Sequence, residues 1–339
     1  MSWVSEELEA ADLGDLRRTR RLIRVVEDLA ASPNASVPQA NRDRAAMQGM
    51  YDFWANRRVD ADAIIRAHAQ RTIERMAGES TVLAIQDTTE LDYSHHRSTQ
   101  GLGGISKARA RGLKVHSVLA ASAAGVPLGI LHQEVWARPK LRKRDDRRRV
   151  LIEQKESMRW LRSLEVTQRV VGDRTRVVTV CDREGDIYEL LAQARSSGSE
   201  FLIRAAQNRQ TTSGEAGEDL VPLFARVEAC AIQGSFSLAL QRTPRRAART
   251  ALVSVRFTRL WLCPPDHLGH LAPIAVTAIL AEEMSVPVKA PPIRWLLLTT
   301  LDVPDFARAR QCLRWYSFRW AIELNQSQYR YTRAQVGGT

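Results

Sequence analysis

Three carboxylates in this sequence have local settings that suit metal-assisted chemistry. Asp87 follows an apolar run at 81–85 and Asp182 follows another at 177–181, so both are expected where a strand ends. Glu323 lies in a stretch with helical periodicity. Carboxylates brought together repel one another, and two divalent cations reverse that repulsion; hard oxygen ligands suit Mg²⁺ or Mn²⁺. Two such ions activate an attacking water or hydroxyl and stabilise the leaving oxygen, which indicates phosphodiester chemistry.

Each carboxylate taken alone also has an ordinary structural interpretation. An aspartate just after a strand is often a turn-former or a helix N-cap. A glutamate on a helix often lies on a solvated face. The metal-site prediction therefore depends on the order of the three residues along one fold.

The residues before Glu323 add a second feature. Tyr316, Arg319 and Glu323 are spaced at i, i+3 and i+7, so they share one helix face, and Arg330 returns to that face if the helix continues. An aromatic ring and an arginine beside a metal-binding glutamate suit a site that holds a DNA phosphate. The alternative is a helix with a mixed amphipathic face.

The charge of the chain favours a polyanionic partner. The 339 residues contain 50 Lys and Arg against 38 Asp and Glu, a net charge of +12 with a pI near 10.1. Nucleic acid is the first candidate for such a basic protein. No run approaches the roughly 20 apolar residues of a membrane span, and the acidic N-terminus does not resemble a signal peptide. We therefore expect a cytoplasmic protein with no membrane partner.

Residues 1–75 are predicted to be helical. An apolar stripe and a basic arc alternate in the first long helix. The stripe consists of Leu16, Leu22, Ile23, Val26 and Leu29, and the arc consists of Arg17, Arg18, Arg21 and Arg24. Asp28 lies four residues after Arg24 and could pair with it, which would blunt the basic arc only slightly. A solvated helix face is the alternative for the arginines, but in a chain of this charge phosphate binding is favoured.

From about residue 80 the pattern changes to an α/β one. Strands are predicted at 81–85, 115–121 and 126–131, followed by a helix at 150–168, a strand at 177–181, a helix at 186–196 and a strand at 200–204. This is the order of the ribonuclease H-like fold. A β-rich insertion at about 205–305 is expected before the helix that carries Glu323. We predict two domains, a helical one at 1–75 and a catalytic one at 76–339.

Over roughly residues 3–324 the sequence resembles the DDE transposases of the insertion-sequence-four type. The resemblance is carried by Asp12-Leu-Gly-Asp-Leu-Arg-Arg-Thr-Arg20, Tyr51-Asp-Phe-Trp-Ala-Asn56, Asp87-Thr-Thr-Glu-Leu-Asp-Tyr93, Gly112-Leu-Lys-Val-His-Ser117, Lys155-Glu-Ser157, Asp182-Arg-Glu-Gly-Asp-Ile-Tyr188 and Tyr316-x-x-Arg319-x-x-x-Glu323. These motifs are highly specific in combination.

The resemblance implies a helical domain that binds transposon-end inverted repeats and a ribonuclease H-like core with a β insertion. It implies DNA nicking, hairpin formation and strand transfer, with Asp87, Asp182 and Glu323 holding two Mg²⁺ or Mn²⁺ ions. Tyr316 and Arg319 would contact end phosphates, and Trp295 would stack on a flipped base. The expected DNA-binding set also includes Arg204, Lys155 and Arg330. The expected partners are double-stranded DNA, as ends and as target, and a second copy of the chain in a synaptic homodimer associated with the nucleoid.

The end of the sequence departs from the family pattern. The family has a lysine seven residues after the glutamate, where this chain has Arg330, and residues 325–339 are largely polar. The family also has a further helical C-terminal region that pairs subunits. We therefore expect a truncated or frameshifted copy, altered after about Leu324. An end-binding protein without useful catalysis, acting as an inhibitor or remnant of transposition, is the main alternative. A ribonuclease H-like nuclease unrelated to transposition is weaker, because the N-terminal motifs indicate end recognition.

Overall fold

The computed structural model describes residues 2–33, 35–96, 98–138, 156–172, 175–215, 217–240, 248–287 and 291–323. The chain divides into two compact units, which we describe separately. The first contains Met1–Arg176 and Trp320–Thr339, and the second contains Val177–Arg319. The chain mixes helices and strands, as the α/β prediction requires. In the part of the chain that the structure describes, no helix is long and apolar enough to span a membrane.

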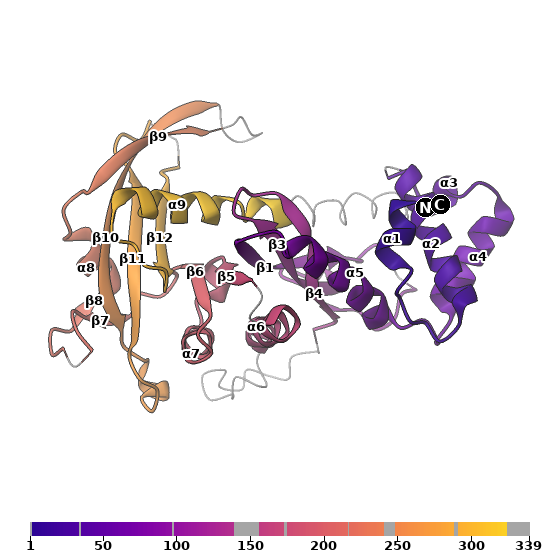
Figure 1. The fold of residues 1–339 in the computed structure, drawn as a ribbon, viewed down its shortest axis with the longest axis horizontal. Helices are drawn as coiled ribbons and strands as arrows, with labels where there is room; N and C mark the ends of the chain where they lie inside the picture. Colours follow the sequence, from indigo (N-terminus) through magenta and orange to yellow (C-terminus); the bar gives the residue numbers. More distant parts are fainter. Residues whose placement is uncertain are drawn as a thin grey trace. The chain divides into compact units, whose positions relative to one another are not determined.

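The first unit begins with helices, as the sequence predicts for residues 1–75 (Figure 1). These are α1 (Trp3–Leu8), α2 (Leu16–Ala31), α3 (Val37–Ala40), α4 (Arg44–Ala55) and α5 (Ala61–Met76). The N-cap side chains of Ser2, Asp15, Asp43 and Asp60 accept backbone N–H bonds at the start of α1, α2, α4 and α5. Such caps satisfy N–H groups that have no partner within the helix.

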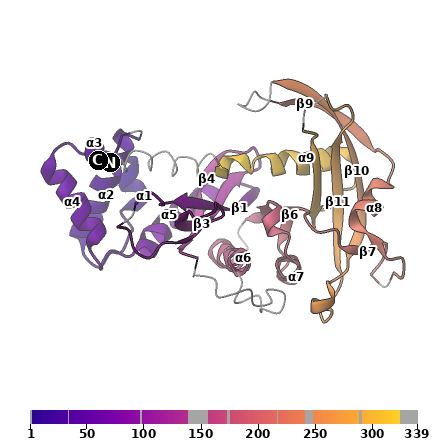
Figure 2. The same cartoon turned by 180° about the vertical axis from the view of Figure 1, so that it is seen from behind.

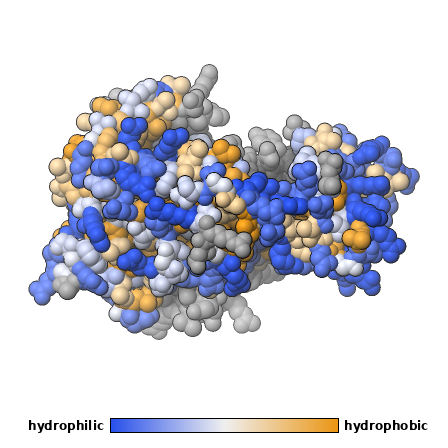
Figure 3. All heavy atoms as spheres, in the orientation of Figure 1, coloured by the Kyte–Doolittle hydropathy of each residue, from blue (hydrophilic) through white to orange (hydrophobic). Residues whose placement is uncertain are grey.

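The apolar core of these helices differs in detail from the predicted stripe. Leu22 packs with Val4, Leu8 and Phe53, and Val25 packs with Val37 and Met50. Leu16, which we predicted in the stripe, is 72% exposed. It is the first residue of α2, and the buried residues of this helix begin at Thr19. Hydrophilic residues cover most of the surface of these helices in the face that Figure 3 shows.

The first unit continues with an antiparallel sheet and one helix. The strands are β1 (Thr81–Asp92), β2 (Gly103–Gly104), β3 (Arg111–Ser122) and β4 (Pro127–Trp136). β3 pairs with β1 on one side and with β4 and the short β2 on the other. The predicted hairpin between 115–121 and 126–131 is confirmed as β3 and β4. α6 (Met158–Val171) contacts all three long strands.

The second unit starts with a parallel pair joined by a helix, in the predicted order. β5 (Arg176–Cys181) leads through the short 3-10 helix η3 (Arg183–Gly185) and α7 (Tyr188–Ser196) to β6 (Glu200–Arg204). Every described residue of 201–203 is fully buried, which explains the continuous apolar run.

The predicted β-rich insertion extends the sheet that contains β6. Its elements are β7 (Gln210–Thr212), β8 (Val221–Pro222), α8 (Leu223–Glu228), β9 (Gly234–Leu240), β10 (Arg249–Leu262), η4 (Asp266–Leu268), β11 (Ile274–Glu283) and β12 (Arg294–Thr299). The strand order is β5-β6-β12-β11-β10-β7-β8, and β9 pairs with β10. α9 (Phe306–Ser317) follows and packs against this sheet (Figure 2).

Candidate nucleic-acid interface and carboxylate positions

Asp87 lies inside β1 rather than at its end. It is half-buried and stands opposite Ser117 of β3, whose hydroxyl accepts a hydrogen bond from the Gln133 side chain at 3.0 Å. The strand continues to Asp92 because residues 88–92 keep their pairing with β3. The sequence prediction of a strand end at Asp87 is therefore wrong, since the polar residues after 87 still form strand.

The other face of β1 carries a buried polar group that the sequence did not single out. The Thr88 hydroxyl lies 2.8 Å from His116 Nδ1, and His116 Nε2 lies 3.3 Å from the Gln86 side-chain oxygen. The ring of Trp160 on α6 meets the His116 ring edge-on. Burial lowers the pKa of His116 to about 3, so the imidazole is neutral. This group fixes α6 over the sheet that carries Asp87.

Asp182 lies immediately after β5, as predicted. One of its carboxylate oxygens accepts the Glu184 N–H at 2.8 Å and so caps η3. The other oxygen makes no hydrogen bond to the described residues, and the side chain is half-buried. One carboxylate oxygen of Asp182 thus caps the turn, and the other remains available to a ligand.

The same motif contains two anchoring residues that we did not predict. Asp186, 5% exposed, accepts N–H bonds from Ala206 and Gln207 and pairs with Arg209. The Tyr188 hydroxyl donates to the Ala272 carbonyl at 2.8 Å, and burial raises the pKa of Tyr188. Both residues tie the segment after Asp182 to the insertion. Because their partners lie outside the motif, the only indication in the sequence was the presence of an acidic and an aromatic residue within it.

Glu323 lies in the helical residues 320–323 and is exposed. It belongs to the first unit with Asp87, whereas Asp182 belongs to the second. Within either unit, the described residues do not gather three His, Cys, Asp or Glu side chains that could hold a metal ion. The set of three stays a prediction, and its donors are all carboxylate oxygens, the ligand type that Mg²⁺ and Mn²⁺ prefer.

In the second unit, three of the predicted DNA-binding residues lie together. The rings of Trp295 on β12 and Tyr316 on α9 meet edge-on with centroids 5.7 Å apart. The Arg319 guanidinium carbon lies 6.0 Å from the Tyr316 ring centroid. We call Trp295, Tyr316 and Arg319 the ring cluster. Arg204 stands opposite Leu297, so its side chain shares the sheet face of Trp295.

The Tyr316 hydroxyl is a buried polar atom of the ring cluster. Tyr316 is 4% exposed, and its hydroxyl has no hydrogen-bond partner among the described residues. A buried hydroxyl without a partner costs free energy. A phosphate oxygen of a bound strand would satisfy it.

The predicted arginines of α2 lie on its outer side. Arg17, Arg21 and Arg24 are exposed, whereas Arg18 is half-buried and donates to the Leu13 carbonyl. Arg21 and Arg24 line a cavity of about 410 Å³ between α2 and the start of α4.

The pair of Arg24 and Asp28 that the spacing allows does not form. Asp28 instead pairs at 2.9 Å with Arg42, which lies between α3 and α4. Arg24 is therefore left exposed at the cavity and available to a phosphate.

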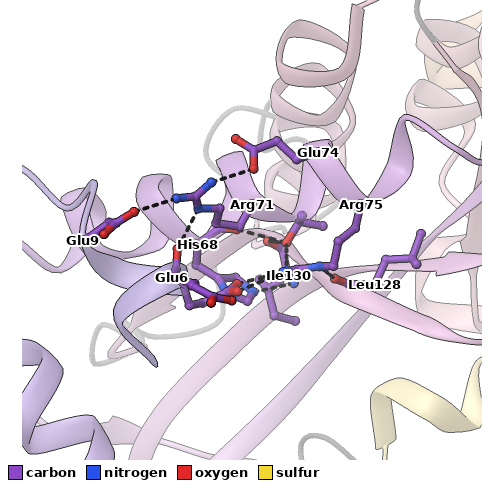
Figure 4. A network of polar contacts seen from close by, with 10 residues as sticks. Glu6, Glu9, His68, Arg71, Glu74, Arg75, Leu128 and Ile130 are labelled. Atoms are coloured by element: carbon purple, nitrogen blue, oxygen red, sulfur yellow. Dashed lines mark hydrogen bonds and ion pairs between the residues drawn. The ribbon is translucent and has the colours of Figure 1, made fainter. Parts of the chain in front are cut away.

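The N-terminal helices are fixed to the edge of the β1–β3–β4 sheet by side chains of α5 (Figure 4). β4 is an edge strand, and its outer backbone groups would otherwise lack partners. The His68 Nε2 accepts the Ile130 N–H at 2.8 Å, Thr72 donates to the Ile130 carbonyl at 3.2 Å, and Arg75 donates to the Leu128 carbonyl at 2.5 Å. We call this set of contacts the edge junction.

Carboxylates of α1 complete the edge junction. Glu7 accepts two bonds from Arg75, both at 2.9 Å, and pairs with His68 Nδ1. Burial lowers the pKa of His68, so the neutral ring donates to Glu7 and accepts from the strand. Arg71 extends the network to Glu9, Glu74 and the Glu6 carbonyl (Figure 4). The junction sets the position of the N-terminal helices relative to the strand that carries Asp87.

Two predicted DNA-binding residues, Lys155 and Arg330, lie outside the described residues. The residue after Lys155 is described: Glu156 forms a two-bond contact with Arg138 at 2.7 and 2.8 Å. The Arg138 hydrogen bonds lower the pKa of Glu156 to about 2. Glu156 thus anchors the start of the segment that leads into α6.

Residues 1–59 match the family model described as transposase DNA-binding. The matched range contains α1 to α4 and the exposed arginines of α2. The match confirms, for this part of the chain, the prediction of a DNA-binding helical region from a transposase. DNA is accordingly a partner of the chain.

Proposed function

We propose that this protein is a cut-and-paste DNA transposase of the insertion-sequence-four type. It binds the inverted repeats at transposon ends, cleaves the strands, forms a hairpin and joins the end to target DNA. The transposase DNA-binding match over residues 1–59 is the observation that carries the proposal. The order of strands and helices from β1 to β6 supports a ribonuclease H-like core. A pair of copies would hold two ends in one synaptic complex.

The proposed chemistry assigns Asp87, Asp182 and Glu323 to two Mg²⁺ or Mn²⁺ ions. These ions would supply activation of the attacking oxygen and charge stabilisation of the leaving one. Asp182 supports the assignment with a carboxylate oxygen that makes no bond to the described residues.

The ring cluster is assigned to holding the DNA strand. The Tyr316 hydroxyl would donate to a phosphate oxygen, the charge of Arg319 would attract the same backbone, and Trp295 would stack on a base. Support comes from the ring contacts and from the buried hydroxyl without a partner. Arg204 would add a cation on the same sheet face.

End recognition is tested by equilibrium binding of the full chain to duplexes with and without the element's end sequence. The variant replaces Arg17, Arg21 and Arg24 of α2 by glutamine. We expect the intact chain to prefer the end duplex and the variant to bind both duplexes more weakly, because phosphate contacts supply affinity that does not depend on sequence. Equal affinity of the intact chain for both duplexes would contradict the proposal.

A further inference from the structure

α9 has two faces, and only one of them carries Tyr316 of the ring cluster. Ala309, Cys312, Leu313 and Tyr316 are buried against the sheet. Arg310 and Arg314 lie one turn apart on the exposed side. Tyr316 follows Arg314 by two residues, which turns its side chain by about 200° around the helix. We call Arg310 and Arg314 the arginine face.

Aromatic rings hold both guanidinium groups of the arginine face. The Arg310 guanidinium carbon lies 5.4 Å from the ring centroid of Phe236 on β9, and that of Arg314 lies 5.6 Å from the ring of Phe318. A cation over a ring face is attracted to it, and the contact limits the orientations of the guanidinium plane. The two side chains are thereby partly ordered before any partner arrives.

The charges of the arginine face are uncompensated. Neither Arg310 nor Arg314 pairs with a carboxylate or donates a side-chain hydrogen bond among the described residues. Arg308, on the same helix, contrasts with them because it donates to Gln311 and to the Asp302 carbonyl. A ring holds a cation in place without cancelling its charge, so both forks of N–H donors remain available.

We propose that the arginine face is a second phosphate-binding surface, on which Arg310 and Arg314 contact the backbone of double-stranded DNA. A planar guanidinium fork matches a phosphate in two-bond geometry, and two such forks one turn apart suit a run of phosphates. The transposase DNA-binding match over residues 1–59 favours DNA over an acidic protein segment as the anion, and the net charge of +12 adds attraction for it. The inference rests on the proposed function, and it adds a contact that the ring cluster cannot make from the opposite side of α9.

The test measures the affinity of the full chain for duplex DNA as a function of salt. The double variant Arg310→Gln/Arg314→Gln should lower the slope of log affinity against log salt by about 1.8, since each lost phosphate contact contributes about 0.9. The control Arg169→Gln/Arg195→Gln removes the same net charge from exposed positions at the ends of α6 and α7. The control should keep the slope of the intact chain. Thermal unfolding should be unchanged in both variants, because all four side chains replaced are exposed.

Several results would overturn the inference. A slope equal to that of the intact chain, or an equal drop in the control, would show that no specific phosphate contact forms there. A change in self-association without a change in DNA affinity would assign the surface to a second copy of the chain. If the intact chain binds no DNA, the proposed function fails together with the inference. The variant Arg310→Lys/Arg314→Lys should restore most of the slope but only part of the affinity, because lysine keeps the charge and loses the fork.

Discussion

The arginines of the N-terminal helices and those of α9 are held by different means. In the N-terminal region, Arg75 pairs with Glu7, Arg71 with Glu9 and Glu74, and Arg42, between α3 and α4, with Asp28. On α9, Arg308, Arg310 and Arg314 each lie over an aromatic ring. A carboxylate partner orders an arginine and cancels its charge, whereas a ring orders it and leaves the charge in place. The first arrangement stabilises the fold, and the second suits the phosphate-binding surface that we propose for Arg310 and Arg314.

The largest effect, on the free energy of unfolding, is expected at the edge junction, where α5 meets β4. Gly129 of β4 has a φ of +141°, and an added Cβ would lie 2.2 Å from the Thr72 hydroxyl. Gly129→Ala should therefore lower the free energy of unfolding by about 2–4 kcal/mol, through backbone strain and loss of the edge junction. Urea denaturation measures this change.

The matched control for this prediction is Gly104→Ala. Gly104 also lies in a strand of the first unit, but an added Cβ there meets nothing within 4 Å. A similar loss of stability in both variants would show that the edge junction does not require Gly129.

The next largest effect is expected when the Tyr316 hydroxyl of α9 is removed. Tyr316→Phe removes a hydroxyl that bonds to none of the described residues, so thermal unfolding should not shift downward. DNA cleavage should fall about 10- to 100-fold, the loss expected for one hydrogen bond to a charged group. Thr250→Val, which removes an exposed hydroxyl from β10 of the same unit, is the control and should cleave normally. Normal cleavage by Tyr316→Phe would show that the hydroxyl does not contribute to cleavage.

The smallest effect concerns pH. The Arg75 hydrogen bond lowers the pKa of Glu7, and burial lowers that of His68. The unfolded chain therefore binds more protons, and stability should fall on acidification, first below the ordinary His value of 6.5 and then below the ordinary Glu value of 4.5. His68→Gln should flatten the upper part of this dependence in urea denaturation. An unchanged profile in that variant would contradict the assignment.

The arginine face should respond differently to the same change in pH. Arginine stays protonated throughout this range, so the effect of Arg310→Gln/Arg314→Gln on DNA affinity should be the same at each pH where the protein is folded. Binding titrations across the range measure it.

The sequence predicted the elements better than the contacts between them. The apolar runs that became β1, β3, β5 and β6 were recognisable because each buries a continuous set of side chains, and β4 was recognisable from the short turn that joins it to β3. The extension of β1 past Asp87 was missed, since its polar residues are paired by β3 rather than by their own propensity.

Contacts between distant residues account for most of what the sequence did not predict. The spacing of Arg24 and Asp28 allowed a pair within α2, but Asp28 pairs instead with Arg42, which lies between α3 and α4. Local periodicity likewise gave no indication that Asp186 holds the loop at 206–209. It did place Tyr316 and Arg319 on one face, and the fold then added Trp295 from β12.

Strand cleavage at the element's own ends tests the proposed function most directly. The full chain is incubated with end-containing duplex and Mg²⁺ or Mn²⁺, beside Asp182→Ala and the control Asp266→Ala, which alters an exposed aspartate of the same unit. We predict cleavage by the intact chain and by the control, and none by Asp182→Ala, with end binding retained in all three. End binding without cleavage by the intact chain, or normal cleavage by Asp182→Ala, would contradict the proposed function.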